Sequence, residues 1–136
     1  MKEDYLNSNY KHTDKTEKII KAFYKVYNAL GFGFLEKVYV NALMHELIKE
    51  GFFAEKERQI KVYYDQRMVG EYYADLIIDS LVIIEVKAAE ALAEEHEHQL
   101  INYLKATEIE VGLLLNFGKK PEVRRKAFSN DKKNLI

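Results

Sequence analysis

Apolar residues recur at helical spacing along the first third of the chain. One stripe runs from Ile19 to Leu30, where large apolar side chains repeat every three or four positions. Asp14 and Glu17 have the spacing of a capping box, which places the helix start at Asp14, and glycines follow the stripe. A second stripe begins near Phe34 and stops at Gly51. The pattern predicts two successive amphipathic helices.

The period of the apolar pattern changes to two in the middle of the chain. Three apolar, β-branched runs follow one another at residues 60–64, 72–78 and 81–86. The short polar links at residues 65–68 and 79–80 suit hairpin turns. This segment is predicted to form an antiparallel three-stranded unit.

A helix over about residues 91–105 and a strand over 111–116 complete the pattern. The order α-α-β-β-β-α-β indicates an α/β (α+β) domain with a mixed sheet against which the helices pack. Because there is no internal repeat or linker, we expect a single domain over residues 13–128, with a flexible arm at 1–12 and a basic tail at 129–136.

Composition narrows the class of protein. The chain has 136 residues, 48% of them hydrophobic and 32% charged, which favours an ordered globular domain. The absence of cysteine excludes disulfides, thiolate metal sites and a cysteine nucleophile, so any metal must bind to oxygen or imidazole. No apolar run approaches the roughly 20 residues of a membrane helix, and the first residues are too polar for a secretory signal. We therefore expect a cytoplasmic protein with no membrane partner.

Charged residues interrupt two strands that are otherwise apolar. Residues 81–84 are apolar at every position, which predicts a strand covered on both faces. Glu85 and Lys87 follow it, and their side chains share a face because they are two residues apart. Asp75 lies in the preceding strand. A buried carboxylate is costly unless it is paired or binds a cation, and two neighbouring carboxylates repel each other. A shared divalent cation would remove both penalties.

These residue types suit metal-dependent hydrolysis of a phosphodiester. Asp75 and Glu85 could bind Mg²⁺ or Mn²⁺ through oxygen, with the backbone carbonyl of Val86 as a third ligand. The metal would activate a bound water and neutralise charge on the phosphate, while Lys87 would hold the water and stabilise the transition state. The alternative is a cross-strand ion pair, in which Asp75 or Glu85 simply neutralises Lys87.

Polar residues on the helices extend this candidate site. Glu36 lies in the first turn of its helix, where it could serve the site or simply stabilise the helix dipole. Gln99 and Tyr103 share a helix face with Leu92, so they point toward the sheet. There Gln99 could orient the substrate or satisfy a backbone group. His96 is expected to be a core-edge histidine rather than a metal ligand.

Five ordered blocks form a longer pattern over roughly residues 14–128. They are Gly33-x-x-Glu36-x-x-Tyr39, residues 70–75, Glu85-Val86-Lys87-Ala88, residues 96–105 and residues 112–118. Together they resemble the GxxExxY proteins, a small family grouped with the PD-(D/E)XK nuclease-like superfamily. Five blocks in order are far more specific than any one motif. The Gln99-x-x-x-Tyr103 element is also similar to one found in RecB-type nucleases.

The resemblance implies a restriction-endonuclease-like core, which is a four-stranded mixed sheet flanked by helices. The implied site residues are the metal and catalytic positions Asp75, Glu85 and Lys87, the helix-borne acidic position and further metal ligand Glu36, and the substrate-side positions Gln99 and Tyr103. The sequence departs from the superfamily's name at one point, because Tyr73-Ala74 precedes the aspartate where the name has a proline.

Three functional hypotheses follow from these residues. The first is a Mg²⁺- or Mn²⁺-dependent nuclease that cuts DNA or RNA, with DNA expected ahead of RNA, through a metal-activated water. Its basic path to the site would consist of Lys11, Lys15, Lys18, Lys21 and Lys25 near the start and Arg124, Arg125 and Lys126 near the end. The second is a non-catalytic nucleic-acid-binding or assembly module, in which Tyr5, Tyr10 and Tyr63 stack on bases or form a homodimer interface. The third is a metal-binding regulator that does not act on nucleic acid.

Overall fold

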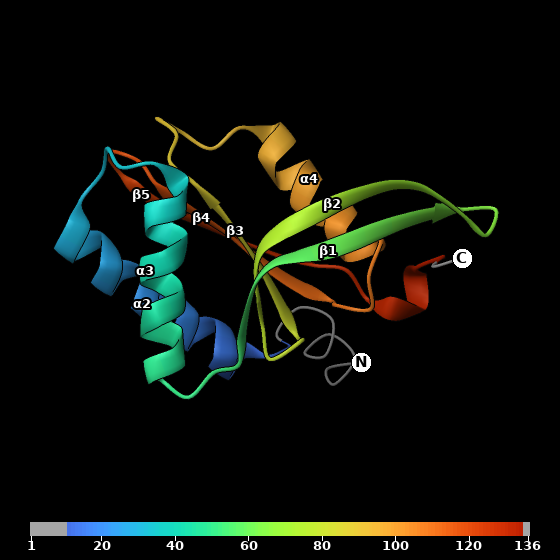
Figure 1. The fold of residues 1–136 in the computed structure, drawn as a ribbon, viewed down its shortest axis with the longest axis horizontal. Helices are drawn as coiled ribbons and strands as arrows, with labels where there is room; N and C mark the ends of the chain where they lie inside the picture. Colours follow the sequence, from blue (N-terminus) through green and yellow to red (C-terminus); the bar gives the residue numbers. More distant parts are fainter. Residues whose placement is uncertain (1–10, 135–136) are drawn as a thin grey trace, which may run out of the picture.

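A computed structural model describes residues 11–134 of the chain (Figure 1). The elements are α2 (Thr13–Leu30), α3 (Glu36–Lys49), β1 (Ala54–Tyr64), β2 (Arg67–Ile78), β3 (Val82–Lys87), α4 (Glu94–Lys105), β4 (Val111–Phe117), β5 (Pro121–Ala127) and a 3₁₀ turn, η1 (Asn130–Lys132). The predicted arm at residues 1–12, with Tyr5 and Tyr10, lies outside the described residues except for its last two positions. The last two positions of the predicted tail also lie outside them.

The sheet is mixed and has five strands in the order β1-β2-β3-β4-β5. Neighbouring strands are antiparallel except for β3 and β4, which run parallel. The mixed sheet flanked by helices confirms the predicted fold class, but the predicted count of four strands is one too few. The additional strand, β5, forms an edge and has only partly buried or exposed residues. Its sequence therefore lacks the apolar run by which a core strand is recognised.

Helices cover both faces of the sheet. α2 and α3 pack on one face, where Val82, Ile84 and Val86 of β3 join their core cluster. α4 packs on the other face, where Ile83 contributes to a second cluster. β3 thus lies at the centre with both faces covered, as its apolar run predicted. No helix among the described residues has the length and apolarity to cross a membrane.

The helix and strand boundaries differ from the predicted ones in two ways. α2 begins at Thr13 with His12 as its N-cap, so the predicted capping box at Asp14 is wrong. β1 and β2 each begin several residues earlier than predicted. The sequence did not reveal these added residues, because they are mostly polar and exposed and show no alternation of apolar and polar positions. Both hairpin turns are confirmed. Their residues Asp65, Gln66, Asp79 and Ser80 all have positive φ, as tight hairpin turns require.

The β1–β2 hairpin extends beyond the rest of the sheet (Figure 1). β2 pairs with β3 only from Leu76 to Ile78, whereas it pairs with β1 along nearly its whole length. Residues 58–74, here called the hairpin arm, therefore lack a strand neighbour on the β3 side. The point where the arm leaves the sheet is the point where the candidate site lies.

Candidate active site

The predicted carboxylates meet where β2 and β3 separate. The ladder between the two strands ends at the pair Leu76 and Ile84. At the next position the backbone N–H of Asp75 donates to Glu85 Oε2 over 2.9 Å. In return, the N–H of Val86 donates to Asp75 Oδ2 over 2.8 Å. Each carboxylate thus takes the place of a backbone carbonyl. Its second oxygen accepts no hydrogen bond from any described residue.

Both carboxylates are held in an environment that disfavours their charge. The Glu85 side chain belongs to a residue only 5% exposed. Burial, and then the charge of Asp75, raise the pKa of Glu85 from its ordinary 4.5 to about 8. Burial also raises the pKa of Asp75, with a further contribution from the charge of Glu36, while the Val86 N–H opposes the rise. Near neutral pH the Glu85 carboxyl therefore favours its protonated form, and a cation bound beside it would displace that proton.

Lys87 is the third residue predicted for the centre of the site, and it forms no ion pair with the two carboxylates. The side chain follows Glu85 by two positions and shares its face of β3, and the residue is half-buried. Its charge lowers the pKa of both carboxyls. Nevertheless, Lys87 forms no ion pair or hydrogen bond with either carboxylate or with any other side chain in residues 11–134. The alternative of a simple cross-strand ion pair is therefore not what the structure contains.

Glu36 is the first residue of α3 and is exposed. Its charge raises the pKa of both Asp75 and Glu85, so its carboxylate faces the same region. However, the described residues contain no cluster of three acidic or imidazole side chains able to hold a metal. The structure thus joins two of the three predicted ligands and does not gather Glu36 with them.

Tyr39 fixes the loop that leads to Glu36. Its hydroxyl donates to the carbonyl of Gly31 over 2.8 Å and accepts from the N–H of Phe34 over 3.1 Å. Its ring stacks on Phe117 with centroids 4.2 Å apart. The sequence indicated Tyr39 as the last position of the Gly33-x-x-Glu36-x-x-Tyr39 block and gave it no structural role. Its role as a clamp depends on a contact with β4 that sequence spacing does not reveal.

Asn116 fixes the segment that follows Lys87. Its amide is fully buried. The amide oxygen accepts a hydrogen bond from the N–H of Ala89 over 2.9 Å, and the amide nitrogen donates to the carbonyl of Ala89 over 2.9 Å and to Glu122 over 3.1 Å. Gly118 allows the same approach, because a Cβ there would lie 2.3 Å from the Ala89 carbonyl oxygen. A polar residue inside an apolar strand was the available signal, since a buried amide requires partners.

The site residues predicted on α4 belong to the helix that covers the second face of the sheet. Tyr103 is 5% exposed, and burial and then the charge of Glu85 raise its pKa to about 12. Its hydroxyl is therefore a neutral hydrogen-bond donor near pH 7. Gln99 is half-buried and forms no hydrogen bond within the described part of the chain. His96 accepts from the N–H of Ala93 over 3.1 Å, so it caps the helix and is structural, as expected.

The N-terminal part of the predicted basic path does not assemble around the carboxylates. Its N-terminal lysines are largely engaged by acids away from the site, in the ion pairs Lys11–Glu110, Lys15–Asp79 and Lys25–Glu46. Arg124 and Lys126 pair with Glu122 and Glu97. Asp79 belongs to the turn at the opposite end of the β2–β3 pair from Glu85. The exposed Lys119 and Lys120 follow β4 at the strand end where Lys87 lies.

Comparison with known proteins places these features in a family. A family model described as the PD-(D/E)XK nuclease superfamily matches residues 13–126. No curated protein gives a significant match. The structure titled "Crystal structure of SSO0001" is similar with a TM-score of 0.48 and 22% sequence identity, over 71% of this chain. The matched region spans 54% of that protein's chain. The finer GxxExxY grouping stays a prediction.

Proposed function

The chain belongs to the PD-(D/E)XK nuclease superfamily, and from that premise we propose that it is a divalent-metal-dependent nuclease that hydrolyses phosphodiester bonds of DNA or RNA. The observation that carries this proposal is the reciprocal bonding of Asp75 and Glu85 across the separated strands. The buried Glu85 carboxylate and the half-buried Asp75 carboxylate each accept a backbone N–H, and the second oxygen of each accepts no hydrogen bond within residues 11–134. Lys87 stands beside them and forms no ion pair or hydrogen bond with a side chain in residues 11–134.

The donor set fits Mg²⁺ or Mn²⁺. Both ions prefer oxygen ligands, and carboxylates held rigidly at adjacent positions supply them. Burial is the main cause that raises the pKa values of Asp75 and Glu85, so a cation beside the two carboxylates would favour their charged forms. A divalent ion there would supply Lewis acidity and neutralise charge on the scissile phosphate. Glu36 is the proposed third acidic residue, which would reach the ion directly or through water.

The remaining residues bind and orient the reacting groups. The Lys87 ammonium is placed to hold the attacking water and to stabilise charge that develops on the phosphate oxygens. The neutral Tyr103 hydroxyl and the Gln99 amide, both on α4, would donate hydrogen bonds to the substrate. The Asn116 bonds to Ala89 hold the segment after Lys87 and so restrict where the ammonium can lie. No nucleophilic side chain is required.

A cleavage assay on single- and double-stranded DNA and RNA tests the proposal. Wild type is compared with Lys87→Ala and Asp75→Asn in Mg²⁺, in Mn²⁺ and in EDTA. Exposed residues of the same types, in Lys120→Ala and Asp65→Asn, serve as matched controls. The proposal expects metal-dependent cutting that both site variants abolish and both controls retain. Cutting that survives in the site variants would contradict it, and binding without cutting would favour the non-catalytic module.

A further inference from the structure

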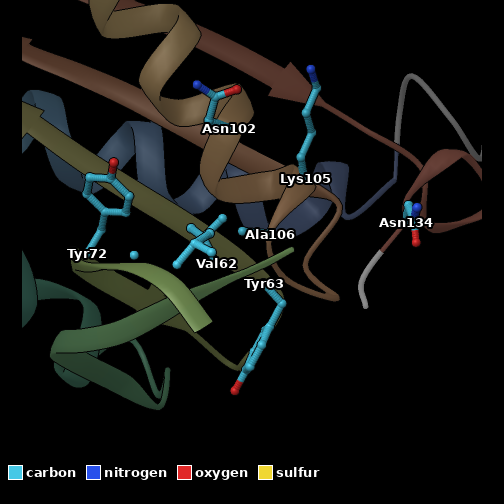
Figure 2. Close-up of a pocket in the computed structure, with 9 residues that line it drawn as sticks. Val62, Tyr63, Tyr72, Asn102, Lys105, Ala106 and Asn134 are labelled. Carbon is cyan, nitrogen blue, oxygen red and sulfur yellow. The ribbon is translucent and has the colours of Figure 1, made fainter. Parts of the chain in front are cut away.

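The hairpin arm and α4 enclose a hollow beside the candidate active site (Figure 2). Its volume is about 400 Å³, within the ~300–1,000 Å³ typical of small-ligand sites. Figure 2 shows Asn102 and Lys105 on the α4 side above Val62, with Tyr72 toward one end and Asn134 toward the other. The arm has separated from β3 at this point, so β2 has no strand neighbour on its β3 side beside the hollow.

Gly70 keeps the floor of this hollow open. It pairs with Val62 in the β1–β2 ladder, and both line the hollow. A Cβ built at Gly70 would meet only the edge of the Tyr72 ring, at 4.0 Å. The register shift after Val62 then turns the end of the arm. A side chain introduced at position 70 would therefore occupy the hollow without a clash against the backbone.

The chemistry of the lining suits a nucleobase attached to a phosphate. Val62 and the half-exposed ring of Tyr72 provide apolar surface for stacking. Asn102 and Asn134 provide amides that can both donate to and accept from the edge of a base. Lys105 provides a cation at the rim, and none of the lining residues within 11–134 is acidic. A negatively charged backbone can therefore approach this surface without repulsion from its lining.

Two tyrosines in contact connect the lining of the hollow to the candidate active site. The rings of Tyr72 and Tyr103 lie with centroids 5.5 Å apart. Tyr103 in turn packs in one cluster with Ala74, the residue before Asp75. Tyr72 and Asp75 are three positions apart on β2, which corresponds to about 10 Å along a strand. That distance is about three steps of a B-form strand at ~3.4 Å each, and fewer steps of an extended strand.

We infer that this hollow is a binding site for an unpaired nucleobase, so that the protein engages single-stranded nucleic acid with one base seated against Tyr72 a few nucleotides from the scissile phosphate. The inference rests on the proposed function for its place near a cleavage site. A base inside a duplex is stacked on both faces and paired along its edge, so it cannot enter a concave site of this kind. An unpaired base presents both a face and an edge.

Binding of a fluorescent oligonucleotide, measured by anisotropy, tests this inference. The Lys87→Ala background in Mg²⁺ prevents cutting during the measurement. DNA and RNA single strands and a duplex of the same sequence are compared. The variants are Tyr72→Ala, which removes the ring, Tyr72→Phe, which retains it, and Gly70→Leu, which fills the hollow. Tyr73→Ala is the matched control, since Tyr73 is also exposed, is adjacent on β2 and does not line the hollow.

The expected result is that Tyr72→Ala and Gly70→Leu weaken single-strand binding by roughly tenfold to a hundredfold, the loss of one base–aromatic stack. Tyr72→Phe and Tyr73→Ala should bind as the parent does, and duplex binding should not change. Equal loss in Tyr72→Ala and Tyr73→Ala, parental binding by Gly70→Leu, or preference for the duplex would each overturn the inference. Because binding is measured without turnover, its outcome does not depend on the outcome of the cleavage assay. A protein that cuts duplex but fails here retains its proposed function.

Discussion

Substitution of Glu85 by glutamine should stabilise the metal-free protein near neutral pH. Burial and the charge of Asp75 raise the pKa of Glu85 from 4.5 to about 8. Between these two values the folded protein retains a proton that the unfolded chain releases. The folded state therefore binds more protons in this window, and the free energy of unfolding must fall as pH rises through it. Glutamine at position 85 is neutral at every pH, and its amide oxygen can still accept the N–H of Asp75.

The size of the effect follows from proton linkage. A difference of one proton between the folded and unfolded states changes stability by on the order of 1 kcal/mol per pH unit. Across the window from about pH 5 to about pH 7, wild type in EDTA should therefore lose roughly 2–3 kcal/mol. The raised pKa of Asp75 acts in the same direction. Saturating Mg²⁺ or Mn²⁺ should remove most of this loss, because the ion binds the deprotonated carboxylates.

Urea denaturation at several pH values, followed by circular dichroism, measures this dependence; the chain has no tryptophan to report it by fluorescence. Wild type and Glu85→Gln are compared in EDTA and in Mn²⁺. Glu90→Gln is the control, because Glu90 is an exposed carboxylate shortly after the same strand. It should keep the wild-type slope, whereas Glu85→Gln should flatten it and lose the response to Mn²⁺. A flat wild-type profile in EDTA, or Glu85→Gln less stable than wild type at pH 8, would refute the reasoning.

Further predictions concern the residues that hold the site in place. Tyr39→Phe retains the stack on Phe117 but loses two hydrogen bonds, so urea denaturation should show a loss of about 1–3 kcal/mol; unchanged stability would contradict the clamp. Asn116→Ala leaves both polar groups of Ala89 unpaired and should cost about 2–4 kcal/mol and reduce turnover. Turnover equal to wild type under folding conditions would show that this segment does not position Lys87. Metal-dependent cleavage by Glu36→Gln should be reduced while Mn²⁺ still binds; loss of Mn²⁺ binding would instead make Glu36 an essential ligand.

The core of the fold was predictable because burial marks the sequence strongly. The central strand β3 is apolar at consecutive positions, and the charges that follow it were recognisable as exceptions. Edge elements leave a weaker mark. β5 and the hairpin arm present polar or exposed residues on much of their surface, so neither alternation nor an apolar run defined their extent.

The convergence of Asp75, Glu85 and Lys87 at one candidate site was predictable because each is a charge within or beside core strand sequence. The backbone hydrogen bonds that hold the two carboxylates were not predictable. Spacing does not show that two strands separate at this point, nor that carboxylates then replace backbone carbonyls. The prediction that the N-terminal lysines form a basic path to the site was wrong for a related reason. The ion pairs of Lys11 and Lys15 join residues 99 and 64 positions apart, and the helical pattern contains no record of such distant partners.

An anomalous difference map from a crystal of this protein soaked in Mn²⁺ tests the central claim most directly. The account predicts a peak between the carboxylates of Asp75 and Glu85, within ligand distance of the oxygen that each leaves without a hydrogen bond, and no such peak in Asp75→Asn. A peak elsewhere on the molecule, or none at these carboxylates at a concentration that supports cleavage, would contradict it.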